Sequence, residues 1–315
     1  MLIRSFRVIA AKLAFAAFAV FAFSAAAEAA VITFVASNGN DANACSLVTA
    51  PCKTLQRAVN VISADGTVRL LTPLVGGATL NKSIMIDGNG ASIVGQIIVA
   101  SPSAVVTLRG LALNGIRAAP HGIRIDSAAA VHIENCTIER YTGDGISFVA
   151  TTATKLFVTD TVSRANSSDG RYADAVNAQV VIENSRFEQN FATGVYLKVA
   201  SASVTGSAAS GNGQLGIILL GQRATVTETT ADNNGSDGFD VRSGTTAILN
   251  SAEATANGAA GLHVETGGDA VVNDCAILGS GLGLAVNNQG TIYTRQNNTL
   301  FGSASGGAPV TAGAY

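Results

Sequence analysis

The chain has 315 residues and a net charge of −2, with 34 glycines and no tryptophan. Charged residues make up 13%, about half the usual share, while 48% of the residues are apolar. This composition excludes an intrinsically disordered chain, because it can bury enough apolar surface to offset the entropy of ordering. It suits short strands joined by tight turns.

Residues 1–29 have the pattern of a secretory signal peptide. Arg4, Arg7 and Lys12 precede an apolar run at 13–23, and 27–29 offer an Ala-x-Ala cleavage site. A transmembrane anchor is the alternative, but the run is short for a bilayer. Cleavage would remove three basic residues and one acidic residue, which changes the net charge from −2 to −4. We expect a secreted or periplasmic protein without a membrane span, and its acidity argues against nucleic acid as a partner.

Residues 30–79 are predicted to form an N-terminal cap. The segment 31–35 is typical of a strand, and Asn, Gly and Asp turn residues follow it. Export permits disulfides, and Cys45 and Cys52 bracket a turn-rich segment, so we predict that they pair. Residues 54–62 carry apolar side chains at helical spacing, which predicts a short amphipathic helix covering the end of the structure behind it.

From 80 to 302 the sequence is organised by a repeat, Asn-x-x-x-Gly, with apolar residues one and three positions after the glycine. The glycines recur every 22 to 25 residues, at Gly122, Gly145, Gly170, Gly194, Gly216, Gly238, Gly261 and Gly283, and the asparagines are Asn166, Asn190, Asn212, Asn234 and Asn257. Such a period indicates a stacked structure in which each turn buries its apolar face on the next. A repeat this short has no room for a crossover helix and fits about three short strands per coil.

We predict that the recurring asparagines and glycines, which should form columns along the stack, serve the structure and not a reaction. Identical amides in successive coils can hydrogen-bond up the stack and satisfy turn backbone groups. We expect the glycines to adopt a φ that L-residues resist. Cys136 and Cys275 hold equivalent places six turns apart, roughly 29 Å at about 4.8 Å per turn. A disulfide cannot span that distance, so buried free thiols are predicted.

The repeat resembles the parallel β-helix repeat of the pectin-lyase-like superfamily over nearly all of the chain after residue 29. Residues 38–59 (NGNDANACSLVTAPCKTLQRAV) resemble the cap of secreted members, and 106–115 (VTLRGLALNG) resemble their early coils. The resemblance implies an all-β fold, a right-handed single-stranded parallel β-helix of about ten coils with a short N-terminal capping helix. We expect 303–315 to be a flexible tail. The superfamily includes lyases, hydrolases, epimerases and proteins with no known reaction, so whether this chain is an enzyme is left open.

Outward residues of one strand should form columns, one residue per coil, which locates a candidate site. Polar side chains concentrate in four consecutive coils, at His121, Arg124, Asp126, Asp144, Asp169, Tyr172, Asp174, Tyr196 and Lys198. An apolar coil follows with Leu215, Ile218 and Leu220, and then a smaller polar group at Asp237, Asp240, Arg242, His263 and Glu265. The first group holds more carboxylates beside aromatic rings and is the preferred site.

One coil in this group is irregular. Arg171 falls at an inward position, where an apolar residue belongs. A shift of two residues would place Ala173 and Ala175 inward and would leave Asp174 facing outward in either register.

The carboxylates suggest two chemistries. Asp144 and Asp169, about 5 Å apart, repel, so one pKa rises or Ca²⁺ binds between them. A raised pKa suits the general acid of a glycoside hydrolase, with another carboxylate such as Asp174 as base or nucleophile. In a lyase, Ca²⁺ and Arg124 or Lys198 would neutralise a uronate while a base takes its α-proton.

The remaining polar residues of the group are expected to bind an acidic or neutral polysaccharide: His121, Arg124, Asp126, Tyr172, Tyr196 and Lys198. The chain matches the full catalytic motif of neither the superfamily's hydrolases nor its pectate lyases. With three histidines and no close thiol pairs, we expect no transition metal and no nucleotide.

A non-catalytic periplasmic or cell-surface scaffold is the alternative function. Asp before Gly is favoured in turns for backbone reasons alone, so the same aspartates can serve the fold only. This reading predicts no turnover and no saturable glycan binding. The oligomeric state is left open.

Overall fold

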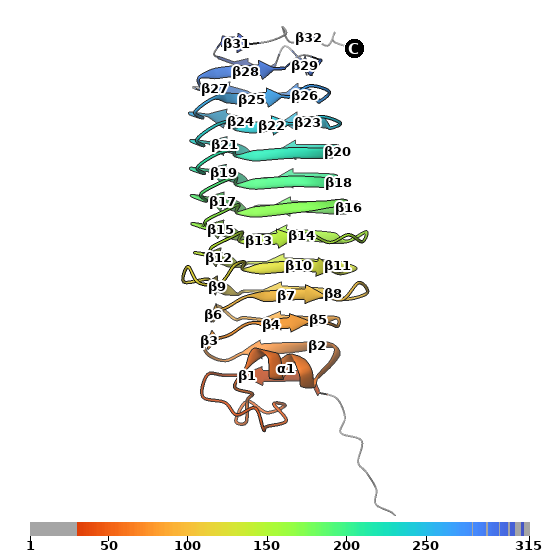
Figure 1. The fold of residues 1–315 in the computed structure, drawn as a ribbon, viewed down its shortest axis with the longest axis vertical. Coiled ribbons are helices and arrows are strands. Elements are labelled where there is room, and N and C mark those ends of the chain that lie inside the picture. Colours follow the sequence, from red (N-terminus) through yellow and green to blue (C-terminus); the bar gives the residue numbers. More distant parts are fainter. Residues whose placement is uncertain are drawn as a thin grey trace, which may run out of the picture.

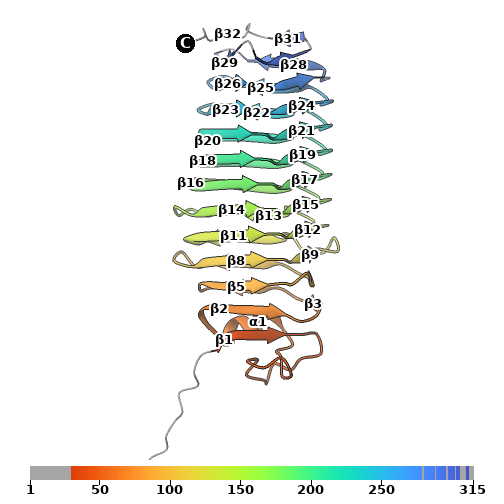
Figure 2. The ribbon, with the colours of Figure 1, turned by 180° about the vertical axis from the view of Figure 1, so that it is seen from behind.

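The structure, a computed structural model, describes residues 30–278, 280–287, 289–295, 297–301, 303–305 and 310–311. The predicted signal peptide at 1–29 lies outside the described residues. The described chain winds into a solenoid of parallel strands, as predicted, in which each coil stacks on the one before (Figure 1). Seen from behind, the same coils form a second continuous face (Figure 2). Within the described ranges, no helix is long and apolar enough to cross a membrane.

Three ladders of strands run along the solenoid, and every pairing between their strands is parallel. The first, which we call the site ladder, contains β4 (Ala78–Leu80), β7 (Ile97–Ala100), β10 (Ile123–Ser127), β13 (Ile146–Phe148), β16 (Arg171–Glu183), β18 (Val195–Thr205), β20 (Ile217–Thr227), β22 (Phe239–Val241), β25 (Ala260–Val264), β28 (Leu282–Val286) and β31 (Ser303–Ser305).

The second ladder contains β1 (Ala30–Val35), β2 (Ile62–Leu70), β5 (Ile84–Asp87), β8 (Val105–Arg109), β11 (Ala130–Glu134), β14 (Lys155–Thr159), the second halves of β16, β18 and β20, β23 (Thr246–Asn250), β26 (Asp269–Asn273), β29 (Thr291–Thr294) and β32 (Val310–Thr311). Because β16, β18 and β20 continue from the site ladder into the second ladder, the two are joined there into one sheet.

The third ladder consists of short strands that close each coil: β3 (Leu74–Val75), β6 (Ser92–Val94), β9 (Ala112–Asn114), β12 (Thr137–Glu139), β15 (Val162–Arg164), β17 (Arg186–Glu188), β19 (Ala208–Ser210), β21 (Thr230–Asp232), β24 (Glu253–Thr255), β27 (Ala276–Leu278) and β30 (Thr299–Leu300). Each coil therefore contributes three short strand segments, which confirms the prediction. β31 and β32 lie inside 303–315, so the ladders extend past the boundary that the sequence suggested at 302.

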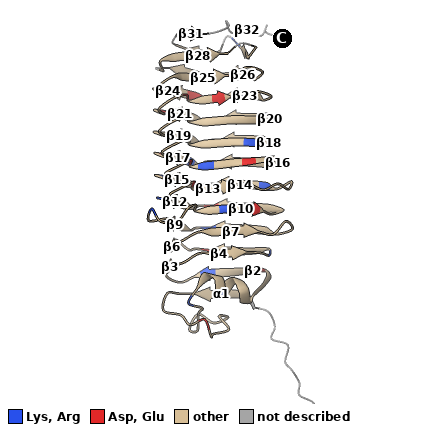
Figure 3. Ribbon diagram, viewed as in Figure 1, with Lys and Arg blue, Asp and Glu red and all other residues tan. Residues whose placement is uncertain are grey.

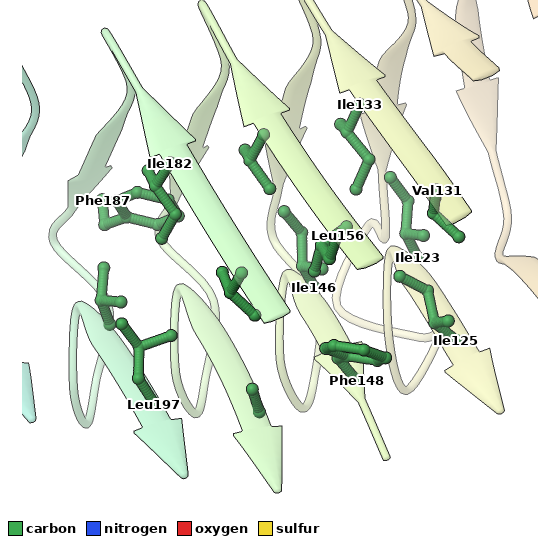
Figure 4. Close-up of a cluster of buried hydrophobic side chains, with 14 of the residues drawn as sticks. Ile123, Ile125, Val131, Ile133, Ile146, Phe148, Leu156, Ile182, Phe187 and Leu197 are labelled. Atoms are coloured by element: carbon green, nitrogen blue, oxygen red, sulfur yellow. The ribbon is translucent and has the colours of Figure 1, made fainter. Parts of the chain in front are cut away.

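The core is a column of aliphatic and aromatic side chains enclosed by the ladders. Figure 4 shows Ile123 and Ile125 of one coil beside Ile146 and Phe148 of the next, with all four fully buried. They are the residues one and three positions after the column glycines. The alternation in the sequence therefore places one face of each strand inward and the other outward.

The N-terminal end is covered by α1 (Leu55–Val61), one residue shorter at each end than predicted. Thr54 is its N-cap and accepts a hydrogen bond from the backbone N–H of Arg57, while Leu55, Ala58 and Val59 are buried. Cys45 and Cys52 form the predicted disulfide in the preceding loop. Cys136 and Cys275 are free and buried, also as predicted.

The asparagine column forms the predicted ladder of amides. Each Nδ2 donates to the Oδ1 of the next coil's asparagine at 3.0 Å, from Asn166 through Asn190, Asn212 and Asn234 to Asn257. The same Oδ1 also accepts the backbone N–H of the preceding asparagine, as Asn212 does from Asn190 at 3.0 Å. One amide per coil thus satisfies a buried turn in its neighbour.

The explanation expected for the glycine column is wrong. All the column glycines are described, and none has a positive φ. Space is the reason instead: a Cβ on Gly170 would lie 2.6 Å from Asn190 Nδ2, and one on Gly194 would lie 2.7 Å from Asn212 Nδ2. At Gly145, Gly170, Gly194, Gly216 and Gly238 the ladder amide thus occupies the place of a side chain, whereas at Gly122 and Gly261 an isoleucine side chain does so. In the middle coils the asparagines and glycines therefore pack as one unit.

Candidate functional site

The outward residues of the site ladder form the predicted columns. Tyr172 of β16 pairs in register with Ser147 of β13 and with Tyr196 of β18. The column then continues through Ile218 and Asp240 to His263. Charged residues are sparse along the site ladder, and Figure 3 marks those on β10, β16 and β18.

An aromatic pair lies at the centre of the predicted site. The rings of Tyr172 and Tyr196 stack with centroids 5.0 Å apart and an interplanar angle of 21°. Both side chains are half-buried. Burial, followed by the charge of Asp174, raises the pKa of Tyr172, which therefore stays a neutral phenol at physiological pH. Such a pair is a suitable platform for a sugar ring.

The predicted acid pair, Asp144 and Asp169, lies in adjacent coils but is more buried than expected. Only 7% and 8% of their surfaces are exposed. Asp144 Oδ1 accepts the backbone N–H of Asp169 at 3.3 Å, and Asp169 Oδ1 accepts that of Thr193 at 2.8 Å. Nδ1 of His121 accepts the backbone N–H of Asp144 at 3.2 Å. The carboxylates of Asp144 and Asp169 thus accept backbone hydrogen bonds from the next coil, in addition to forming a candidate site.

Asp169 has the perturbed acidity expected of a general acid. Burial raises its pKa to about 6, and the charge of Asp144 adds to the rise, while the hydrogen bonds from Thr193 oppose it. A carboxyl group with this pKa is partly protonated in mildly acidic solution and can deliver a proton. Of the two aspartates, Asp169 is therefore the better acid.

The other predicted residues do not converge on this pair. Asp174 lies five residues along β16 from Asp169, about 16 Å at strand spacing, and pairs with Lys198 at 3.1 Å. Arg124 pairs with Asp126 of its own strand at 2.6 Å. Asp174 is thus part of an ion pair beyond the tyrosines, and the three predicted catalytic aspartates do not share one centre.

The acid pair does not fit a Ca²⁺ site. One oxygen of Asp144 and one of Asp169 already accept backbone hydrogen bonds, whereas Ca²⁺ takes about six to eight oxygen ligands. Over the described part of the chain, no group of three His, Cys, Asp or Glu residues is placed to hold a metal ion. The acid–base chemistry suggested by the sequence fits these two aspartates better than the cation.

The strand register is unshifted at Arg171, which pairs in register with Ile146 and Val195 and points inward, fully buried. Ala173 and Ala175 are also buried, as suggested. The Nη1 of Arg171 donates to the carbonyl oxygen of Tyr196 at 3.3 Å, its guanidinium lies 5.9 Å from the ring centroid of Phe148, and its Nε and Nη2 have no hydrogen-bond partner. Burial lowers its pKa to about 9. The regular repeat already places Arg171 inward, and the sequence analysis left the two registers open.

Replacing Arg171 by methionine is expected to stabilise the protein by about 1–4 kcal/mol, because a buried and incompletely paired charge is exchanged for an apolar chain of similar length. Denaturant unfolding would measure the change. Arg186→Met, on an exposed arginine paired with Glu188, is the matched control and should change stability by less than about 0.5 kcal/mol. A destabilised Arg171→Met variant would contradict this explanation.

The apolar coil beyond the tyrosines borders a surface hollow of about 270 Å³. It is lined by Val176, Lys198, Val199, Leu220, Gly221, Gln222 and Ser243. The hollow lies beside Leu220, between Lys198 and Ser243, whereas the outward residue Ile218 of the same coil is only 3% exposed.

Comparisons with known proteins agree on the architecture. The sequence matches the family described as "Right handed beta helix region" over residues 80–227 and 172–314. No curated protein sequence gives a significant match. Together the family matches cover most of the chain, and they include every coil of the site ladder from β7 to β28.

Three solved structures share the fold at low identity. The pectate lyase Pel9A is 18% identical, with a TM-score of 0.52 over 87% of this chain and 76% of its own. The A-module of the mannuronan C-5 epimerase AlgE4 from Azotobacter vinelandii is 17% identical, with a TM-score of 0.60 over 76% and 80%. The GH136 lacto-N-biosidase from Eubacterium ramulus is 11% identical, with a TM-score of 0.52 over 89% and 67%. The chain belongs to the right-handed β-helix family.

Proposed function

We propose that this protein is exported and that it binds and processes a polysaccharide along the outward face of the site ladder. The glycan lies over the Tyr172–Tyr196 pair, and Asp169 acts as general acid. The observation that carries the proposal is the carboxyl group of Asp169, whose pKa is raised to about 6, which lies one coil from a second carboxylate and two residues before the strand that bears a stacked aromatic ring.

Roles for the surrounding residues follow from their positions. Asp144 raises the pKa of Asp169 through its charge and is the second carboxylate of the reaction, as base or nucleophile. Lys198 and Asp174 are paired at the other end of the platform and offer a donor and an acceptor to sugar hydroxyls. The structural neighbours named above include a lyase, an epimerase and a glycosidase, which supports a carbohydrate substrate in general and no single reaction.

One observation favours the alternative, a non-catalytic scaffold. Asp144, Asp169 and also Asp237 each accept a backbone N–H from the next coil. These hydrogen bonds stabilise the turns of the solenoid whether or not a substrate is present. In this alternative the fold is the same, and the raised pKa of Asp169 has no catalytic role.

Assays for reducing ends and for unsaturated products, over a panel of acidic and neutral polysaccharides, test the proposal. The expected result is turnover of at least one polysaccharide, strongly reduced in Asp169→Asn and reduced in Tyr172→Ala. Saturable binding that is lost in Tyr172→Ala, with no turnover, would restrict the function to binding. Neither turnover nor binding in the wild-type protein would favour the scaffold.

A further inference from the structure

The second polar group of the site ladder is organised around one histidine. His263 of β25 lies beside Asp237, which precedes β22, and beside Asp240 within β22. Asp237 Oδ1 accepts the backbone N–H of Ala260 at 2.8 Å, and its Oδ2 lies 3.2 Å from His263 Nδ1. The carboxylate is thus fixed by one oxygen and directs the other at the imidazole.

These contacts decide which nitrogen of His263 carries the proton. An ionised carboxylate can only accept, so Nδ1 donates to Asp237 and Nε2 of the neutral ring keeps a lone pair. The side chain of His263 is 21% exposed. His121 is the reverse case, because its Nδ1 accepts the backbone N–H of Asp144 and its neutral ring therefore carries the proton on Nε2. The chain thus holds two His–Asp pairs in opposite tautomers.

Asp240 supplies a second and unused acceptor beneath the same ring. It is 1% exposed, and its Oδ2 accepts from Arg242 Nε at 2.8 Å. Its Oδ1 is buried without a hydrogen-bond partner and lies 4.0 Å from His263 Nδ1. Two carboxylates thus lie near Nδ1 of His263, one hydrogen-bonded to it and the other with an oxygen that has no partner.

The charges around His263 select the kind of ligand. The guanidinium of Arg242 is paired with Asp240 and lies 3.5 Å from Glu265, while Asp237 contacts His263, so three carboxylates stand against one guanidinium here. This surplus of negative charge repels anionic groups. An exposed lone pair on Nε2 accepts from a hydrogen-bond donor. A neutral hydroxyl satisfies both conditions.

We propose that His263 is the hydrogen-bond acceptor of a second site on the ladder, that Asp237 is its positioning residue, and that the ligand is a neutral polyhydroxylated molecule. On binding, a ligand hydroxyl donates a hydrogen bond to Nε2, while Asp237 holds the proton of the ring on Nδ1. This site lies three coils from the acid pair, about 14 Å, and does not rest on the chemistry of Asp169.

The tautomer is tested by long-range proton–nitrogen NMR on the ¹⁵N-labelled protein, which contains three histidines. His263→Gln identifies the His263 signals. The expected result is Nδ1–H for His263 in the wild-type protein. In Asp237→Asn, the amide oxygen can still accept from Ala260, so its NH₂ group faces the ring and should shift His263 to the Nε2–H form. A wild-type His263 already in the Nε2–H form, or no shift in Asp237→Asn, would overturn the positioning role.

Ligand binding is tested by affinity electrophoresis in gels that contain a neutral β-glucan, galactan or mannan. Retardation by at least one polymer is expected, weakened roughly tenfold in both His263→Gln and Asp237→Asn and unchanged in His132→Gln, which lies on the second ladder. No retardation of the wild-type protein, or equal retardation of all variants, would overturn the ligand class. Asp169→Asn leaves the His263–Asp237 pair intact. If retardation were lost only in Asp169→Asn, the polymer would bind at the acid pair, which would contradict this proposal and not the proposed function.

Discussion

Asp169→Asn is expected to lower the turnover of a processed polysaccharide by about 10²–10⁴-fold, the usual contribution of a general acid. The substitution preserves shape, and an amide oxygen can still accept the backbone N–H of Thr193, which Asp169 now accepts at 2.8 Å. What it removes is the ionisable proton. Turnover rates at saturating substrate measure the loss, and Asp269→Asn, on the second ladder, is the matched control and should retain full activity.

The same variant should be more stable than the wild-type protein at neutral pH. Burial raises the pKa of Asp169 from 3.8 to about 6, so its protonated form favours the folded state below pH 4, and this contribution is lost as the pH rises through 6. The ionised carboxylate then costs up to about 3 kcal/mol, which asparagine avoids. Urea unfolding at pH 4 and pH 7.5 should give nearly equal stabilities at the lower pH and a more stable variant at the higher pH. A variant less stable than the wild-type protein at pH 7.5 would show that the negative charge itself supports the fold.

Asn212→Ala should cost about 3–5 kcal/mol of unfolding free energy. Asn212 Oδ1 accepts from both the backbone N–H and the Nδ2 of Asn190, and its own Nδ2 donates to the carbonyl oxygen of Phe187. Alanine would remove the acceptor of the buried backbone N–H of Asn190 and the side-chain donor to Phe187, at about 1–3 kcal/mol for each, whereas Asn190 Nδ2 keeps its hydrogen bond to the carbonyl oxygen of Ser163. Denaturant unfolding measures the loss.

Asn177→Ala is the control for the ladder prediction. Asn177 is exposed and donates one hydrogen bond of 3.4 Å, to the carbonyl oxygen of Thr151. Its removal should change stability by less than about 0.5 kcal/mol. If the two alanine variants lost similar amounts, the amide ladder would not be a main source of stability.

The fold could be predicted from the sequence because each coil repeats the same local pattern of residues. Apolar residues one and three positions after the glycine, the asparagine four before it and the helix at 54–62 each indicate structure independently, and they agree. The asparagine ladder was foreseen because its members recur at one register. The reason for the glycine was not, since space beside a neighbouring coil's amide is a contact between segments that are distant in sequence.

The candidate site was predictable only as a set of columns. Register alone brings Tyr172 beside Tyr196 and Asp144 beside Asp169. It cannot reveal that the two aspartates turn toward backbone N–H groups, which buries them and raises the pKa of Asp169. The register places Arg171 inward, but it cannot reveal the contacts of the buried guanidinium with Phe148 and with the carbonyl oxygen of Tyr196.

Glycan-array binding of the chain without residues 1–29 tests the central claim most directly. Saturable binding to at least one polysaccharide is predicted for the wild-type protein. It should be lost when Tyr172 and Tyr196 are both replaced by alanine, and retained when Phe157, an outward aromatic residue stacked on His132 of the second ladder, is replaced instead. A wild-type protein that binds no glycan, or a double variant that binds as well as the wild type, would contradict the assignment of the site ladder as a polysaccharide-binding face.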